Sequence, residues 1–402
     1  MEPTRKELVL AGLLFLALPL LVEAGLRISG TRFEPQLYQP SRERGWTLRP
    51  GASGLVSGET RQEVRINSHG FHDRERSYEK PDGTFRIAVL GNSWTEALQV
   101  PLEKTYPAVL EGELQGRSCW NGKRIEVLNF GVAGYSTGQE LLALRQEVWK
   151  YQPDLVVLAL YPARDIANNV RELNNAANPE QSPYYIYRDG ELIEDSAFSG
   201  LPSLQPRQIA LQKLRYGIDD RVQVLQAINA LQRIAKLRFA TAAAKQRAQK
   251  FGVGELEFDI YAPPRSIEMS EAWKVTEGLL TLMQDEVKAH GAEFRVVVLA
   301  TRPQVLPDPA KREELRAKLE VKDFTYVDRR LCEFGAKQDI PVTLLSPALS
   351  AYAETHHVYL NGFNDHNWGA GHWNETGHRL AAEAIAADLC GKVQSAGRAG
   401  QE

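Results

Sequence analysis

Two residues of types that perform nucleophilic catalysis stand beside predicted core elements. Ser93 follows the buried apolar run Ile87–Leu90 through a glycine-containing turn, and His372 comes directly before the predicted last helix. A serine hydroxyl is a poor nucleophile without a base, so this interpretation requires a base elsewhere in the chain. A histidine at the same end of a sheet meets that requirement. Ser93 is therefore the candidate nucleophile and His372 the candidate base.

A glycine-rich turn, 129–140, follows a second predicted strand and contains Gly134. Glycine lets the backbone approach a substrate closely. The Gly134 N–H could therefore join that of Ser93 in binding the oxyanion of a tetrahedral intermediate. Taken alone, such a turn is more simply explained by ordinary turn chemistry.

The elements that must position these turns follow an alternating pattern. Apolar strands are predicted near 86–90, 125–129, 154–160, 294–299 and 341–345, and helices near 103–115, 137–150, 267–290 and 375–391. Apolar strands separated by helices imply a parallel sheet covered on both faces. The pattern breaks between about 170 and 265, which predicts an insertion with a helical run from about 208 to 250. We therefore expect one three-layer α/β/α domain over 85–392, after a β-rich lead-in at 31–84 and before a flexible tail at 393–402.

Composition excludes several classes of protein. The 402 residues are 43% hydrophobic and 25% charged with a net charge of −3, which is ordinary for a globular protein and gives no field directed at nucleic acid. No nucleic-acid partner is expected. The three cysteines, Cys119, Cys332 and Cys390, allow at most one disulfide and lack metal-ligand spacing. Neither a metal nor another cofactor is expected.

The first 30 residues resemble an export signal. Arg5 and Lys6 precede the uncharged run Leu8–Val22. This segment is either a cleaved signal peptide or a retained membrane anchor, and the lack of a polar cleavage region favours the anchor. In both cases the rest of the chain would lie in the periplasm or on the extracytoplasmic face of the cell membrane, with the inner membrane as a partner of the helix.

Four sequence blocks, in order, resemble those of the SGNH (GDSL-like) hydrolases. They are Gly91–Glu96, Gly134, Ala163–Asp165 and Gly371–Asn374. The stretch Ile66–Phe71 and the N-terminal segment resemble exported bacterial members related to the alginate O-acetylation proteins. The resemblance implies an SGNH-type fold with Ser93 as nucleophile, His372 as base and Gly134 at the oxyanion.

The chain departs from the family pattern in the first, third and fourth blocks. Asn92 stands where the first block usually has Asp, and Arg164 where the third block has an oxyanion-binding Asn. Arg164 could donate a hydrogen bond to the oxyanion instead, or the side chain of Asn168 or Asn169 could reach the oxyanion. The family also has an Asp two or three residues before its histidine, where this chain has none. Asp365 is the nearest upstream carboxylate and could orient His372, although a loop Asp that makes only local turn bonds is as good an explanation.

The resemblance implies a serine esterase or O-acyltransferase. The expected substrates are acetyl or other acyl esters of a cell-envelope or secreted polysaccharide, handled alone or within an O-acetylation complex. Two other functions stay open. The first is a non-catalytic glycan-binding or scaffold protein, which the altered blocks favour and the Ser93–His372 pair disfavours. The second is a lipid esterase beside the membrane, which would have an apolar tunnel rather than an open polar groove.

Overall fold

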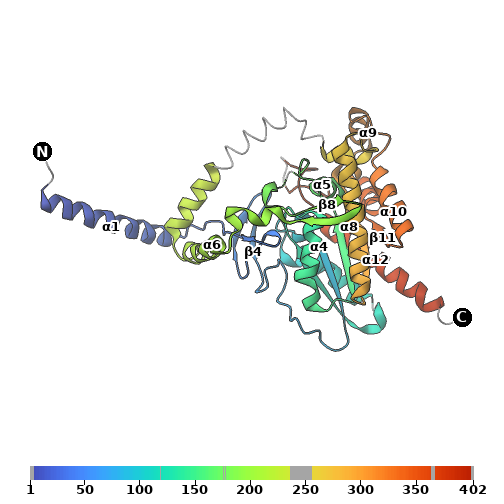
Figure 1. Cartoon of the computed structure of the whole chain (residues 1–402), viewed down its shortest axis with the longest axis horizontal. Coiled ribbons are helices and arrows are strands. Elements are labelled where there is room, and N and C mark those ends of the chain that lie inside the picture. The colour runs from blue at the N-terminus through green and yellow to red at the C-terminus, as the bar shows by residue number, and fades with distance from the viewer. Residues whose placement is uncertain are drawn as a thin grey trace.

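The computed structural model describes residues 4–117, 119–174, 176, 178–235, 256–363 and 367–399, and its centre is a parallel sheet (Figure 1). The sheet has five strands in the order β11–β10–β7–β5–β6. Their bounds are Thr84–Gly91 (β5), Arg124–Gly131 (β6), Leu155–Leu160 (β7), Glu293–Val298 (β10) and Val342–Leu344 (β11). Every residue of β5 and β7 is buried, which explains their continuous apolar sequence. The predicted α/β class, strands and parallel pairing are confirmed.

The main helices of this domain flank the sheet. They are α2 (Ser93–Glu96), α3 (Tyr106–Gly116), α4 (Thr137–Gln146), α5 (Pro162–Asn168), α8 (Ile267–Ala289), α9 (Pro309–Lys318), α10 (Tyr326–Gln338), α11 (Ser346–His356) and α12 (Glu375–Ala399). Helix α3 packs against α12, whereas α4 and α5 pack against α8. The chain moves one way along the sheet from β5 to β6 and the other way from β6 to β7, so right-handed crossovers place α3 and α4 on opposite faces.

The lead-in and the insertion contain short antiparallel hairpins. The lead-in pairs β1 (Tyr38–Ser41) with β2 (Gly45–Leu48), and β3 (Ser53–Ser57) with β4 (Arg61–Arg65). Its small apolar cluster includes Leu98 of the main domain, so the lead-in is packed onto that domain. The insertion contains a hairpin that the sequence did not reveal, β8 (Tyr184–Arg188) with β9 (Glu191–Asp195), followed by α6 (Pro206–Asp219). Of the predicted helical run, residues 236–250 lie outside the described residues.

The chain begins with a long helix, α1 (Arg5–Ser29), which extends away from the body (Figure 1). Its last turns contact the insertion: Glu23 Oε2 accepts a hydrogen bond from the Val224 N–H at 2.9 Å, and Arg27 donates to the Arg221 carbonyl at 2.6 Å. Among the helices of the described residues, none is both long and apolar enough to cross a bilayer. The predicted membrane span is therefore not supported.

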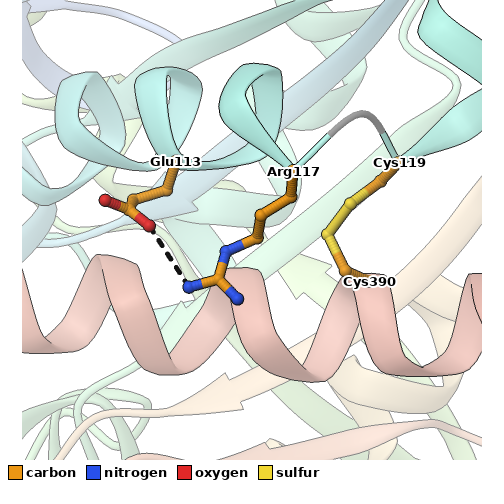
Figure 2. Close-up of a disulfide and its surroundings, with 4 residues drawn as sticks. All are labelled: Glu113, Arg117, Cys119 and Cys390. Atoms are coloured by element: carbon orange, nitrogen blue, oxygen red, sulfur yellow. Dashed lines mark hydrogen bonds and ion pairs between the residues drawn. A yellow bond between two sulfur atoms is a disulfide. The ribbon is translucent and has the colours of Figure 1, made fainter.

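A disulfide joins Cys119, just after α3, to Cys390 in α12 (Figure 2). Both cysteines are buried, and they are 271 residues apart in sequence. Figure 2 also shows the ion pair between Glu113 in α3 and Arg117, which directly follows this helix. Cys332 is a free thiol. The bridge therefore closes most of the main domain into one covalent loop.

Removing this bridge is expected to destabilise the fold. Because the closed loop is long, the double variant Cys119→Ser/Cys390→Ser should lose about 2–5 kcal/mol of unfolding free energy. Urea unfolding followed by circular dichroism measures this loss, with Cys332→Ser as the matched control that keeps the bridge. Superimposable unfolding curves for the double variant and the control would contradict the prediction.

Candidate active site

Ser93 stands at the carboxyl end of β5, where that strand turns into the short helix α2. Asn92 caps this helix, because its side-chain Oδ1 accepts a hydrogen bond from the Trp94 N–H at 3.0 Å. Gly91 is required by close packing, since a Cβ there would collide with the Thr95 side chain. The turn therefore holds the half-buried Ser93 at the mouth of the crevice between β5 and β7.

Three side chains form a continuous hydrogen-bonded chain, which we call the triad (Ser93, His372 and Glu59). His372 Nε2 lies 2.8 Å from Ser93 Oγ, and its Nδ1 lies 2.7 Å from Glu59 Oε1. The His372 backbone N–H also donates to Glu59 Oε2, at 2.8 Å. The structure thus brings together the two residues singled out from sequence and adds a carboxylate on the far side of the imidazole. This arrangement is that of a nucleophile, its base and an orienting acid.

The acid of the triad is not the one that we predicted. Asp365 lies outside the described residues, while Glu59, in the turn between β3 and β4, holds Nδ1. A neutral imidazole that accepts at Nε2 has one ring N–H, on Nδ1, and a single carboxylate suffices to accept it. Glu59 therefore takes the position assigned to Asp365. The only sequence signal was the absence of an acid at residues 369–371, which indicates a missing partner but not where it lies.

Two contacts hold Glu59 in place, one through its neighbour Thr60 and one with the loop that contains Gly371. Thr60 Oγ1 donates to the Gln99 carbonyl at 2.8 Å, which ties the β3–β4 turn to the main domain. Gly371 has φ of 70°, and a Cβ at this position would collide with the Glu59 carboxylate. Burial tends to raise the pKa of Glu59, but the hydrogen bonds and charge of His372, with the nearby Arg302 charge, outweigh it and hold this pKa below its usual range. Glu59 is therefore ionised at neutral pH.

The triad opens into a pocket of about 480 Å³ that also contains the predicted oxyanion donors. Its lining residues are Glu59, Asn92, Ser93, Trp94, Gly134, Tyr135, Tyr161, Arg164, Asn168, Ala176, Arg302, Gly371 and His372. Gly134 has φ of 80° and lies against the Trp46 ring, so the backbone conformation and the close approach both favour glycine. Of the alternative donors, Asn168 lines the pocket, whereas Asn169 donates to Thr276 Oγ1 at 2.9 Å.

Arg302 is a pocket residue that sequence reasoning missed. It begins the short 3₁₀ helix η8 (Arg302–Val305), beyond the end of β10 and outside the four blocks. Together with Arg164 it gives the pocket two guanidinium groups, against the one carboxylate of Glu59. The pocket thus offers charged hydrogen-bond donors to a substrate that carries oxygen acceptors.

Comparisons with known proteins give distant similarities. No family model matches the chain. An arylesterase of Vibrio mimicus is 29% identical over 96 residues, which are 22% of this chain and 46% of that protein, so the match spans about half the length of this relative.

Among solved structures, the chain is similar to an acetyl xylan esterase at 11% identity and a TM-score of 0.39, over 76% of this chain and 99% of that one. It is also similar to a lipase/acylhydrolase from Enterococcus faecalis at 13% identity and a TM-score of 0.37, over 77% and 96% of the two chains. A putative lipolytic protein of the G-D-S-L family from Desulfitobacterium hafniense shows 11% identity and a TM-score of 0.32, over 75% and 97%. These similarities are too remote to assign an activity, which we derive from the site itself.

Two buried acids explain why Asn92 stands where the resembling family has Asp. Asn92 Nδ2 donates to Asp165 Oδ1 at 2.6 Å, and Asp165 Oδ2 accepts from the Tyr161 N–H at 2.6 Å. Glu140 lies close by, fully buried. Burial raises the pKa of Asp165 and, with the charge of Asp165 added, that of Glu140, so the pair retains a proton near neutral pH. An amide at position 92 supplies the donor that this site needs.

An acid at position 92 should therefore weaken the fold in a pH-dependent way. Asn92→Asp loses the donor to Asp165 and adds a carboxylate with a raised folded-state pKa, so its stability is kept at low pH and lost as pH rises. We expect a loss of at least about 1–3 kcal/mol relative to wild type at pH 8, and a smaller loss at pH 5.5. Urea unfolding at the two pH values measures the difference.

Asn92→Ala is the matched control, since it removes the donor without adding a charge. Its destabilisation should depend less on pH than that of Asn92→Asp, because it removes only the hydrogen bond that lowers the Asp165 pKa and adds no second acid. Equal stability of Asn92→Asp and wild type at pH 8 would contradict this account of the buried acids.

Proposed function

We propose that this chain is a serine esterase that acts through an acyl intermediate on Ser93. The observation that carries the proposal is the unbroken hydrogen-bonded triad, whose nucleophile faces a pocket that Gly134 and Arg164 also line. A serine, a histidine and a carboxylate in this order are what acyl transfer requires. A scaffold or binding protein has no use for such a chain of hydrogen bonds.

In the proposed reaction, Ser93 Oγ attacks the acyl carbonyl while His372 Nε2 takes the hydroxyl proton. Glu59 stays ionised and keeps the second proton of the imidazolium on Nδ1. The backbone N–H groups of Ser93 and Gly134 and the Arg164 guanidinium stabilise the oxyanion. His372 then protonates the leaving alcohol, and water or a second alcohol releases the acyl group by the reverse steps.

Features of the pocket and of the chain support a small acyl group on a hydroxyl-rich substrate. Arg164, Asn168 and Arg302 line the pocket, which matches the polar groove expected for a polysaccharide better than the apolar tunnel expected for a lipid esterase. The buried disulfide suits a compartment that permits oxidation, as does the export-like N-terminal sequence. We therefore propose acetyl esters of an extracytoplasmic polysaccharide as substrates, with hydrolysis or transfer to a sugar as the second step.

The triad predicts that catalysis depends on Glu59 and not on Asp365. With p-nitrophenyl acetate as substrate, Ser93→Ala and His372→Ala should each reduce kcat by roughly 10⁴-fold or more, and the double variant should be no worse, because the residues act as a unit. Glu59→Gln should lose about 10²–10⁴-fold, since it removes the charge that stabilises the imidazolium.

Asp365→Asn is the matched control and should keep kcat within about twofold, because Glu59 already accepts the one ring N–H on His372 Nδ1. The reverse pattern, with Asp365→Asn inactive and Glu59→Gln active, would restore the acid predicted from sequence. Labelling by a serine-directed fluorophosphonate, present in wild type and absent in Ser93→Ala, checks the nucleophile independently.

Arg164 as an oxyanion donor gives a separate prediction. Arg164→Ala should lower kcat by roughly 10²–10³-fold with little change in KM, and Arg164→Asn should recover part of the loss. Melting temperatures measured on the same variants separate this from a structural role. An unchanged kcat together with a lowered melting temperature would show that Arg164 only supports the loop.

A further inference from the structure

The peptide group between Ala133 and Gly134 is held by a side chain of the lead-in. Trp46, in β2, donates a hydrogen bond from its indole Nε1 to the Ala133 carbonyl at 2.9 Å. This carbonyl and the Gly134 N–H belong to one trans peptide group, in which the C=O and N–H bonds point in opposite directions. A donor that fixes the Ala133 carbonyl therefore also fixes the direction of the Gly134 N–H.

Further contacts restrict the same turn. A Cβ on Gly134, which lines the active-site pocket, would lie 3.2 Å from the Trp46 ring, so the ring and the backbone are in close contact. The Ala133 N–H, on the preceding peptide, donates to the Glu96 carboxylate. That carboxylate also accepts a hydrogen bond from the Tyr38 hydroxyl of β1, at 2.8 Å. Ala133 is thus held through both its N–H and its carbonyl.

Trp46 is itself fixed by its surroundings. It is buried, and its backbone carbonyl accepts a hydrogen bond from the Tyr135 hydroxyl at 2.6 Å. The rings of Trp46 and Tyr135 meet edge to face, with 5.8 Å between their centroids. The turn before β2 is tied to α4, because the Arg44 carbonyl accepts a hydrogen bond from Gln139 Nε2 at 2.8 Å. The indole N–H is therefore a preorganised donor to the Ala133 carbonyl.

We propose that Trp46 is a positioning residue for the oxyanion site: its indole N–H holds the Ala133 carbonyl so that the Gly134 N–H faces the oxyanion. This inference rests on the proposed function, in which the Gly134 N–H stabilises that oxyanion. A misdirected peptide weakens a hydrogen bond that forms in the transition state, and leaves binding of the ground-state ester unchanged. The lead-in thus serves the reaction twice, since β2 supplies Trp46 and the β3–β4 turn supplies Glu59.

Trp46→Phe tests this role, because it keeps an aromatic ring beside Gly134 and removes the donor to Ala133. With p-nitrophenyl acetate, kcat should fall about tenfold with little change in KM, since the oxyanion donor is misdirected but not deleted. The kcat is expressed per serine labelled to completion by the fluorophosphonate, so that loss of folded protein does not imitate the effect. Trp149→Phe is the matched control, because Trp149 stacks on His290, and it should keep kcat within about twofold.

A second measurement separates positioning from packing. Phenylboronic acid accepts the Ser93 oxygen at boron, with the hydroxyl proton passing to His372, and forms a tetrahedral anion that resembles the reaction intermediate. Its inhibition constant, which does not depend on the amount of folded enzyme, should rise about tenfold in Trp46→Phe and stay unchanged in Trp149→Phe. An unchanged kcat or inhibition constant in Trp46→Phe, or an equal effect in Trp149→Phe, would overturn the proposal. Wild-type protein that neither hydrolyses the ester nor reacts with the fluorophosphonate would instead overturn the proposed function itself.

Discussion

The hydrogen bond between Glu59 and His372 connects segments 313 residues apart, and the arrangement of the active site depends on it. It fixes the imidazole so that Nε2 faces Ser93, and it requires the β3–β4 turn to lie against the loop before α12. The packing of the lead-in on Leu98 and the hydrogen bond from Thr60 to Gln99 support that contact. The lead-in is therefore part of the site, even though it contributes nothing to the central sheet.

The strand order supplies the remaining geometry. Because the chain leaves β5 toward β6 and then returns past it to β7, the helices diverge and a crevice opens at the carboxyl ends of β5 and β7. Ser93 follows the first of these strands, and the helix that bears Arg164 follows the second. Gly134, after β6, completes the same edge. Three turns that are far apart in sequence thus meet in one pocket.

The parts that could be predicted from sequence are those that depend on local pattern. The central strands β5 and β7 were recognisable because burial on both faces demands continuous apolar runs, and Ser93 could be recognised because it stands next to such a strand. His372 could be recognised because it stands next to the predicted last helix. Glu59 was not recognisable, since nothing in a hairpin turn of the lead-in records that it will face residue 372. The same limit applied to Asn92. Its departure from the family pattern was visible, but the reason is a hydrogen bond of 2.6 Å to Asp165 in α5, which is 73 residues away in sequence.

The buried acids also bear on the charge that a substrate would meet. If Asp165 and Glu140 were both ionised, their negative charges would offset part of the positive charge of Arg164, which acts on Asp165. Burial raises the pKa of both, so the pair retains a proton and its negative charge is smaller than two carboxylates would give. Glu59, in contrast, is kept ionised by His372 and Arg302. Negative charge is thus concentrated beside His372, where an imidazolium would form in the proposed reaction, while Arg164 and Arg302 bring positive charge to the same pocket.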